Sequence, residues 1–241
     1  MKKNKLLMVL VMVFVLSLTA CGNSNQADSG NANDTADQRN SAAEQKDSAA
    51  QEKKSEGTVP KDGNVLVSYF AVAENSDVDA VSSASVSDVN GETKGRMTAL
   101  AEMIQEKTGG ELFSIKTSVK YPGDIGKLID YAQEEQDKDA RPELTSHIDN
   151  LDDYSVIFVG FPTWWYDLPQ ILYSFFDEYD FSGKTIIPFN VHNGSRFSGT
   201  IETIQELEPE ATVITDGFTV NERDVPKAAG DVADWLEGIG Y

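Results

Sequence analysis

The chain has 241 residues, with 40 acidic and 20 basic side chains and a formal net charge of -20 at neutral pH. This excess of negative charge argues against binding to nucleic acid, whose phosphates would be repelled, and against electrostatic docking on anionic lipid. The one cysteine, Cys21, has no second thiol with which to form an intramolecular disulfide.

The first twenty residues are typical of a secretory signal. Three lysines precede an apolar run from Leu6 to Leu16, which is too short to span a membrane comfortably. The sequence Leu-Thr-Ala-Cys that ends at Cys21 resembles the bacterial lipobox, in which cleavage leaves the cysteine as a lipid-bearing amino terminus. We therefore predict a lipoprotein signal peptide at 1–20, lipidation of Cys21, and an extracytoplasmic chain held to the bacterial cell membrane through its lipid anchor only.

The next segment has the composition of a disordered tether. Residues 22–57 contain no aromatic residue and no Val, Ile, Leu or Met, so they cannot bury enough apolar area to offset the entropy lost on ordering. We predict a lipidated cysteine and tether at 21–57. The remaining residues, 58–241, are long enough for one domain with a good core and short for two.

Strand and helix patterns alternate through the domain. Apolar runs rich in β-branched residues predict strands, and apolar residues at helical spacing predict helices. The expected strands are 64–70, 111–115, 153–159, 184–190 and 212–219, and the expected helices are 96–107, 124–135, 168–179, 199–207 and 226–236. With right-handed crossovers, this alternation predicts an α/β fold with three layers: a doubly wound, five-stranded parallel sheet in the order 2-1-3-4-5, covered by helices.

A run of three aromatic residues follows the third strand. Pro162 and Pro169 turn the chain between them, and the consecutive rings of Trp164, Trp165 and Tyr166 cannot all point into one core. At least one ring should lie over open space, where it could cover the flat face of an aromatic ligand. Open α/β sheets bind ligands at the carboxyl ends of their strands, which favours this interpretation over ordinary core packing.

Several stretches together resemble the flavodoxin family, and look most like a bacterial branch with a Trp-Trp loop. They are Val65 to Phe70, Gly160 to Trp165, Phe181 to Phe189, and Gly194-Ser195, and the likeness covers roughly 63–238. The resemblance implies one noncovalent FMN, with its phosphate in the turn after the first strand and its ring between the turns after the third and fourth. It also implies a negatively charged surround, with no catalytic residue and no metal ligand.

The resemblance assigns cofactor contacts to three groups of residues. The first turn would contribute Ala71, Gly95, Arg96, Met97 and Thr98; the second Pro162, Thr163, Trp164, Trp165 and Tyr166; and the third His192, Asn193, Gly194, Ser195 and Arg196. For His192 the alternative is a turn histidine with no role in binding.

The first turn departs from the family pattern. Residues 72–94 intervene before the helix, as a lid or as a disordered excursion, and Gly95-Arg96-Met97 stands where the family has Gly-Asn-Thr. Arg96 could supply a charge-assisted contact to phosphate of about 1.5 to 3 kcal/mol, roughly what two lost hydroxyl contacts would have given. Further candidates are Thr93 and the serines at 82, 83, 85 and 87.

The sequence therefore predicts an FMN-binding, lipid-anchored domain that exchanges electrons with a redox partner protein or a small donor or acceptor. One alternative is a flavin-dependent NAD(P)H or quinone reductase. The other is a non-flavin binding module on the same fold, which Arg96 and Arg196 support because Arg196 replaces a family glycine and could crowd the flavin edge.

Overall fold

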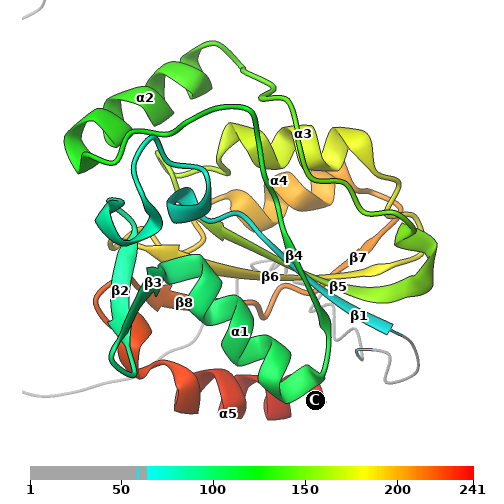
Figure 1. Cartoon of the computed structure of the whole chain (residues 1–241). Helices are drawn as coiled ribbons and strands as arrows, with labels where there is room; N and C mark the ends of the chain where they lie inside the picture. Colours follow the sequence, from blue (N-terminus) through cyan, green and yellow to red (C-terminus); the bar gives the residue numbers. More distant parts are fainter. Residues whose placement is uncertain (1–58, 60–63) are drawn as a thin grey trace, which may run out of the picture. The chain divides into compact units, whose positions relative to one another are not determined.

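A central parallel sheet with helices on both faces organises the computed structural model, which describes Val59 and residues 64–241 (Figure 1). The predicted signal peptide, lipidation site and tether lie outside these described residues. The strands of the main sheet are β1 (Asn64–Tyr69), β4 (Glu111–Ser114), β5 (Tyr154–Pro162), β6 (Thr185–His192), β7 (Thr212–Val213) and β8 (Phe218–Asn221). Their order is β4-β1-β5-β6-β7, with β8 also beside β6 and every pairing parallel. The predicted order 2-1-3-4-5 is confirmed.

The fifth predicted strand is wrong as a single element. Residues 212–219 form β7, which pairs with the start of β6, and the beginning of β8, which pairs with its end. Ile214 donates its amide to the Ile186 carbonyl, so alternate residues of β6 face this neighbour, and Pro188 is the next of them. Because proline has no N–H to donate, the ladder is interrupted there.

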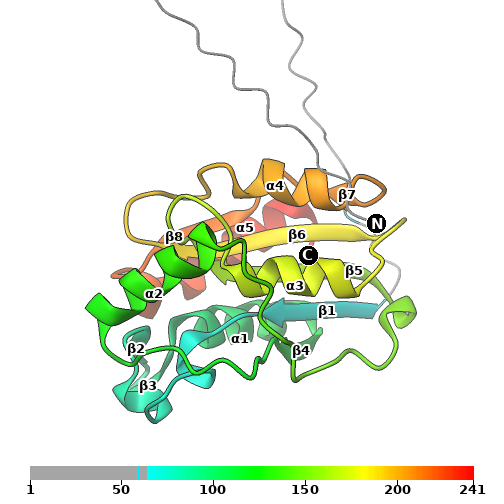
Figure 2. The same ribbon diagram turned by 90° about the horizontal axis from the view of Figure 1, so that it is seen from above.

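Two layers of helices cover the sheet. The helices α1 (Arg96–Thr108) and α5 (Ala229–Ile239) lie on one face, and α3 (Gln170–Glu178) and α4 (Thr200–Leu207) lie on the other (Figures 1 and 2). The remaining helix, α2 (Ile125–Asp137), lies on the same side of the sheet as α3 and farther from the sheet (Figure 1). Alternate side chains of the central strands feed the two cores: Val156 and Phe158 belong to one, Ile157 and Val159 to the other. This explains the unbroken apolar run of β5.

Helix ends differ from the sequence prediction by a few residues. The closing helix begins at Ala229 rather than at 226, because Pro226 lies in a short 3-10 helix, Val225–Lys227, that precedes it. The helix after the aromatic run begins at Gln170, directly after Pro169. Within the described residues, no helix is both long and apolar enough to cross a membrane.

The segment 72–94 is an ordered insertion and not a disordered excursion. It contains two 3-10 helices, Val72–Glu74 and Ala80–Ser82, and the antiparallel hairpin of β2 (Val86–Val89) and β3 (Glu92–Gly95). Asn90 and Gly91 form the hairpin turn with φ of 56° and 81°, the left-handed pair that Asn-Gly adopts at low cost. The strand β3 runs directly into α1, so the insertion lies at the amino-terminal end of that helix.

Candidate functional site

A cavity of about 780 Å³ lies where β1, β5 and β6 end. This volume is in the range of small-molecule and cofactor sites. All the predicted site residues line it except Gly95, Thr98 and Arg196. Sequence reasoning missed one apolar wall from α2 and several other lining residues: Ile125, Leu128, Ile129, Ala132, Val72, Ala84, Val191 and Glu222. Ser85, one of the serines considered from the insertion, also lines the cavity.

The aromatic run forms a strained two-residue hairpin. Trp164 and Asp167 exchange two backbone hydrogen bonds of 3.0 and 2.8 Å, with Trp165 and Tyr166 between them at φ of 46° and 68°. Two large residues in the left-handed region cost of order 1–3 kcal/mol each, and such strain persists only where surrounding contacts impose it. Strain of this kind concentrates at ligand-binding sites.

The three rings lie in three different environments. The Trp164 ring is partly buried at the edge of the cavity and packs edge-on against Phe70 and Tyr121 of the core, at 5.7 and 5.5 Å between centroids. The Trp165 ring lines the cavity, remains 44% exposed, and donates its Nε1 hydrogen to the Ile129 carbonyl of α2 at 3.1 Å. Tyr166 is 72% exposed. Trp165 is therefore the ring best placed to cover a flat ligand.

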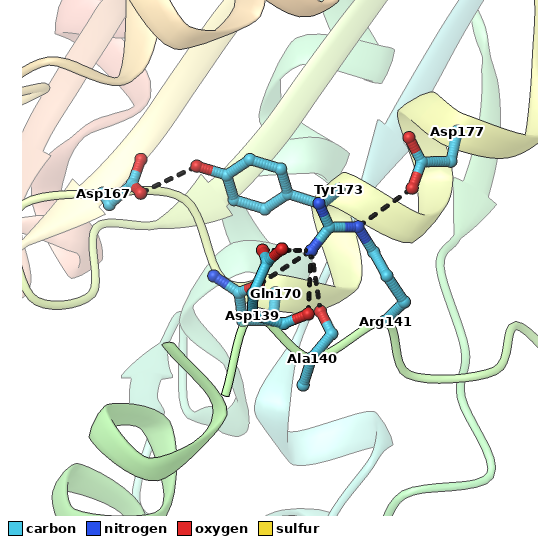
Figure 3. Close-up of polar contacts among 7 residues, drawn as sticks. All are labelled: Asp139, Ala140, Arg141, Asp167, Gln170, Tyr173 and Asp177. Carbon is cyan, nitrogen blue, oxygen red and sulfur yellow. Dashed lines mark hydrogen bonds and ion pairs between the residues drawn. The ribbon is translucent and has the colours of Figure 1, made fainter. Parts of the chain in front are cut away.

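A network of polar side chains attaches the hairpin to α3 (Figure 3). Tyr173 of α3 donates its hydroxyl to Asp167 Oδ2 at 2.7 Å, and the guanidinium of Arg141 lies 4.8 Å from the Tyr173 ring centroid. Arg141 also binds Asp139 and Asp177 at 2.7 and 2.9 Å. Burial, followed by the contact with Asp167, raises the pKa of Tyr173, so its hydroxyl stays protonated and continues to donate. The network thus joins the segment after α2, the helix α3 and the strained turn.

We predict that replacing Tyr173 with phenylalanine loosens the turn. A hydrogen bond to a charged group contributes about 1.5 to 3 kcal/mol, so the amide hydrogens of Trp164 and Asp167 should exchange roughly tenfold faster or more. The measurement is hydrogen exchange resolved by residue. The matched control is Tyr154→Phe, which removes the equivalent 2.6 Å bond to Glu111 and should leave these two amides unchanged. Equal exchange in wild type and Tyr173→Phe would remove the assigned role.

The turn after β6 presents a neutral hydrogen-bond donor. The Gly194 amide donates to His192 Nδ1 at 2.8 Å, which assigns the ring proton to Nε2. Burial lowers the pKa of His192, the nearby Arg196 lowers it further, and Glu222 opposes both. The ring is therefore neutral at neutral pH. Gly194 has a φ of 108°, which a residue with a side chain rarely adopts, so glycine is required for this turn.

The second and third turns are bonded to each other. Asn190, fully buried on β6, donates to Thr163 Oγ1 and to the Arg196 carbonyl at 2.5 and 2.9 Å. Thr163 donates in turn to the same carbonyl at 2.8 Å. Arg196 thus contributes its backbone to the frame of the site, while its side chain does not line the cavity.

The first turn differs most from expectation. Arg96 Nη1 pairs with Glu222 Oε2 at 2.7 Å, and Arg96 Nε donates to Ser87 Oγ at 3.2 Å. Thr98 donates its hydroxyl to Glu74 at 2.6 Å, away from the cavity lining. A Cβ on Gly95 would come within 2.9 Å of Thr98 Oγ1, so this glycine packs closely against Thr98, and it does not line the cavity. The wall that should receive a phosphate therefore holds a guanidinium already paired with a carboxylate.

These features define a class of protein. The doubly wound sheet carries a cavity at its topological switch point, with aromatic and apolar walls, a neutral histidine that can donate a hydrogen bond, and a glycine turn that allows close backbone approach. This arrangement fits a flat aromatic cofactor. No group of three or more metal-binding side chains occurs in the part of the chain that the structure describes.

Comparison with known proteins identifies the family. The flavodoxin family model matches residues 84–239, and the chain belongs to the flavodoxin family. A candidate flavoprotein from Bacteroides eggerthii is 21% identical with a TM-score of 0.56, covering 74% of this chain and 98% of that one. One from Bacteroides uniformis is 24% identical with a TM-score of 0.56, covering 73% and 98%. A flavoprotein from Lactobacillus acidophilus in complex with FMN is 20% identical with a TM-score of 0.48, covering 68% and 97%. No curated protein matches the chain.

Proposed function

We propose that the domain binds FMN noncovalently in the cavity and takes part in electron transfer. Membership of the flavodoxin family supports FMN as the ligand. The observation that carries the proposal is the strained hairpin, which places the Trp165 ring on a cavity wall at the carboxyl end of β5. Bound FMN would supply the redox chemistry, and the protein would position the cofactor and set the charge around it.

The residues of the second and third turns have distinct parts in this proposal. Trp165 covers a face of the flat ring, and Ile125 and Ile129 of α2 extend that apolar wall. His192 offers its Nε2 hydrogen to an acceptor on the polar edge of the ring. Gly194 allows the backbone to approach closely. None of these side chains acts as a nucleophile.

The sequence supports the remaining parts of the proposal. The signal-like amino terminus and Cys21 favour an extracytoplasmic lipoprotein that is anchored by lipid to the bacterial cell membrane, and the stretches Gly160 to Trp165 and Phe181 to Phe189 favour the Trp-Trp loop branch. The redox partner is a protein or a small donor or acceptor, and the net charge of -20 favours a basic protein. A flavin-dependent NAD(P)H or quinone reductase uses the same cofactor and is the alternative within redox chemistry.

One observation favours a second function, a non-flavin binding module. The guanidinium of Arg96 is paired with Glu222, so the phosphate-binding part of the site is altered. Titration of the purified chain with FMN, riboflavin and FAD, followed by flavin fluorescence, tests the choice. Saturable quenching by FMN supports the flavoprotein proposal. A folded protein that binds none of the three contradicts it and leaves the binding module.

We predict that Trp165→Ala weakens FMN binding about fivefold or more. Loss of an aromatic contact costs about 1 kcal/mol in addition to the buried area. The control is Trp165→Phe, which keeps a ring but loses the bond to the Ile129 carbonyl. It should retain most of the affinity, as measured by fluorescence titration, with circular dichroism as the check on folding. Equal FMN affinity in the alanine variant and the wild type would show that Trp165 does not contact the flavin.

A further inference from the structure

We infer that Glu222 is a specificity-determining residue: by pairing with Arg96 it weakens the grip of the cavity on a phosphate, so that FMN is only modestly preferred over riboflavin. This inference rests on the proposed flavin function and adds the charge preference of the site. Glu222 lies just after β8, 126 residues from Arg96, so nothing in the local sequence pattern of the first turn indicates it.

The charges on the cavity wall balance. Among the described residues that line the cavity, Arg96 is the one permanently charged cation and Glu222 the one carboxylate. Their side chains are 21% and 26% exposed, so water screens the pair only in part. His192 adds no charge, because burial lowers its pKa. The wall at which the FMN phosphate would bind therefore has a formal charge of zero.

The pair is built into the frame of the site. The Arg96 amide donates to the Ser85 carbonyl at 2.9 Å, and Arg96 Nε donates to Ser87 Oγ, so the insertion fixes both ends of this residue. Glu222 is fixed by its own amide, which donates to the His192 carbonyl at 2.9 Å. The carboxylate, which follows β8, is thus held beside the end of β6 that carries the neutral histidine.

A phosphate that binds at this wall meets a carboxylate of the same sign of charge. A phosphate monoester carries a charge of about -1.5 to -2 at neutral pH. To reach the guanidinium of Arg96 it must share or replace the contact with Glu222, and it then lies beside a carboxylate of like charge. Riboflavin, which has a hydroxyl in place of the phosphate, meets no such repulsion. The ratio of the two dissociation constants therefore reports the effect of Glu222 on the phosphate alone.

The test compares FMN and riboflavin binding to the purified chain by fluorescence titration. We expect Glu222→Gln to raise the ratio of the riboflavin to the FMN dissociation constant about tenfold, through tighter FMN binding and with riboflavin affinity within twofold of wild type. Arg96→Gln should lower the ratio toward one, and the double variant Arg96→Gln with Glu222→Gln should lie between the two single variants. The control Glu206→Gln removes an equal charge from the exposed surface of α4 and should leave the ratio unchanged.

Three outcomes would overturn the inference, and each has a different meaning. Flavin binding with a ratio that Glu222→Gln changes by less than twofold, or lowers, contradicts the role of Glu222 and leaves the flavin function standing. Absence of binding of either flavin to the wild type and all variants, with folding confirmed by circular dichroism, contradicts the flavin function and this inference together. A ratio that rises in Glu206→Gln as much as in Glu222→Gln would assign the effect to net charge and not to the pair.

Discussion

Replacing Gly160 with alanine should lower the free energy of unfolding by about 3 kcal/mol, the upper part of the range for overpacking a core. Gly160 lies near the end of β5, opposite Phe189 of β6. A Cβ there would lie 2.2, 2.4 and 2.8 Å from three carbons of the Phe189 ring. That ring is fully buried, and protein cores are close-packed, so either the ring or the strand must move. Urea denaturation measures the loss.

The matched control for this variant is Gly238→Ala. Gly238 lies inside α5, and a Cβ added there meets no atom within 4 Å. Alanine is the better helix former, so this variant should raise the free energy of unfolding by about 0.5 to 1 kcal/mol. The same chemical change is therefore expected to have opposite signs at the two positions. A loss below about 1 kcal/mol at Gly160 would show that the Phe189 ring adapts easily.

Raising the pH from 5 to 8 should destabilise the protein through Glu135. This carboxyl is 7% exposed on α2, and burial raises its pKa from 4.5 to about 7, although a 3.2 Å hydrogen bond from Tyr121 partly opposes the shift. Between these two values the folded state holds a proton that the unfolded state has released. The free energy of unfolding therefore falls as the pH rises through this window, by at most about 3 kcal/mol.

The variant Glu135→Gln isolates this contribution. It removes the titrating group and keeps an acceptor for the Tyr121 hydroxyl, so stability at pH 8 should rise and its pH dependence between 5 and 7 should become shallower. Part of the slope should remain, because burial also raises the pKa of Glu208 to about 7. The measurement is urea denaturation at pH 5 and pH 8, with the exposed Glu106→Gln as control. Parallel pH profiles for Glu135→Gln and wild type would rule out this role for Glu135.

Much of the fold was predictable because its signals are local. The β-branched run of β5 and the helical spacing in α1 are complete within a few residues, and the alternation of strands and helices then limits the topology to very few orders. The hairpin of β2 and β3 also had a local signal, the Asn90-Gly91 pair between extended segments. This signal was not used, because the long insertion was interpreted as a single lid or disordered excursion. The interruption between β7 and β8 had none, because its cause, Pro188, lies on the neighbouring strand.

The site was predictable where one turn supplies several of its residues. Trp164, Trp165 and Tyr166 are adjacent in sequence, and so are His192 to Ser195, so a family resemblance could place each group at the sheet edge. The separate environments of the three rings depend on tertiary contacts, such as the Ile129 carbonyl that binds Trp165. Glu222 reaches Arg96 from a distant strand end. Contacts of this kind leave no periodic signal in the sequence.

The brevity of the outermost strands bears on how the protein avoids association with copies of itself. A long flat sheet edge presents unpaired N–H and C=O groups that can template the addition of another chain, as in amyloid. Here one border is β4, with four residues, and the other is divided into β7, with two, and β8, with four. The missing N–H of Pro188, which divides that border, therefore also acts against edge-to-edge aggregation.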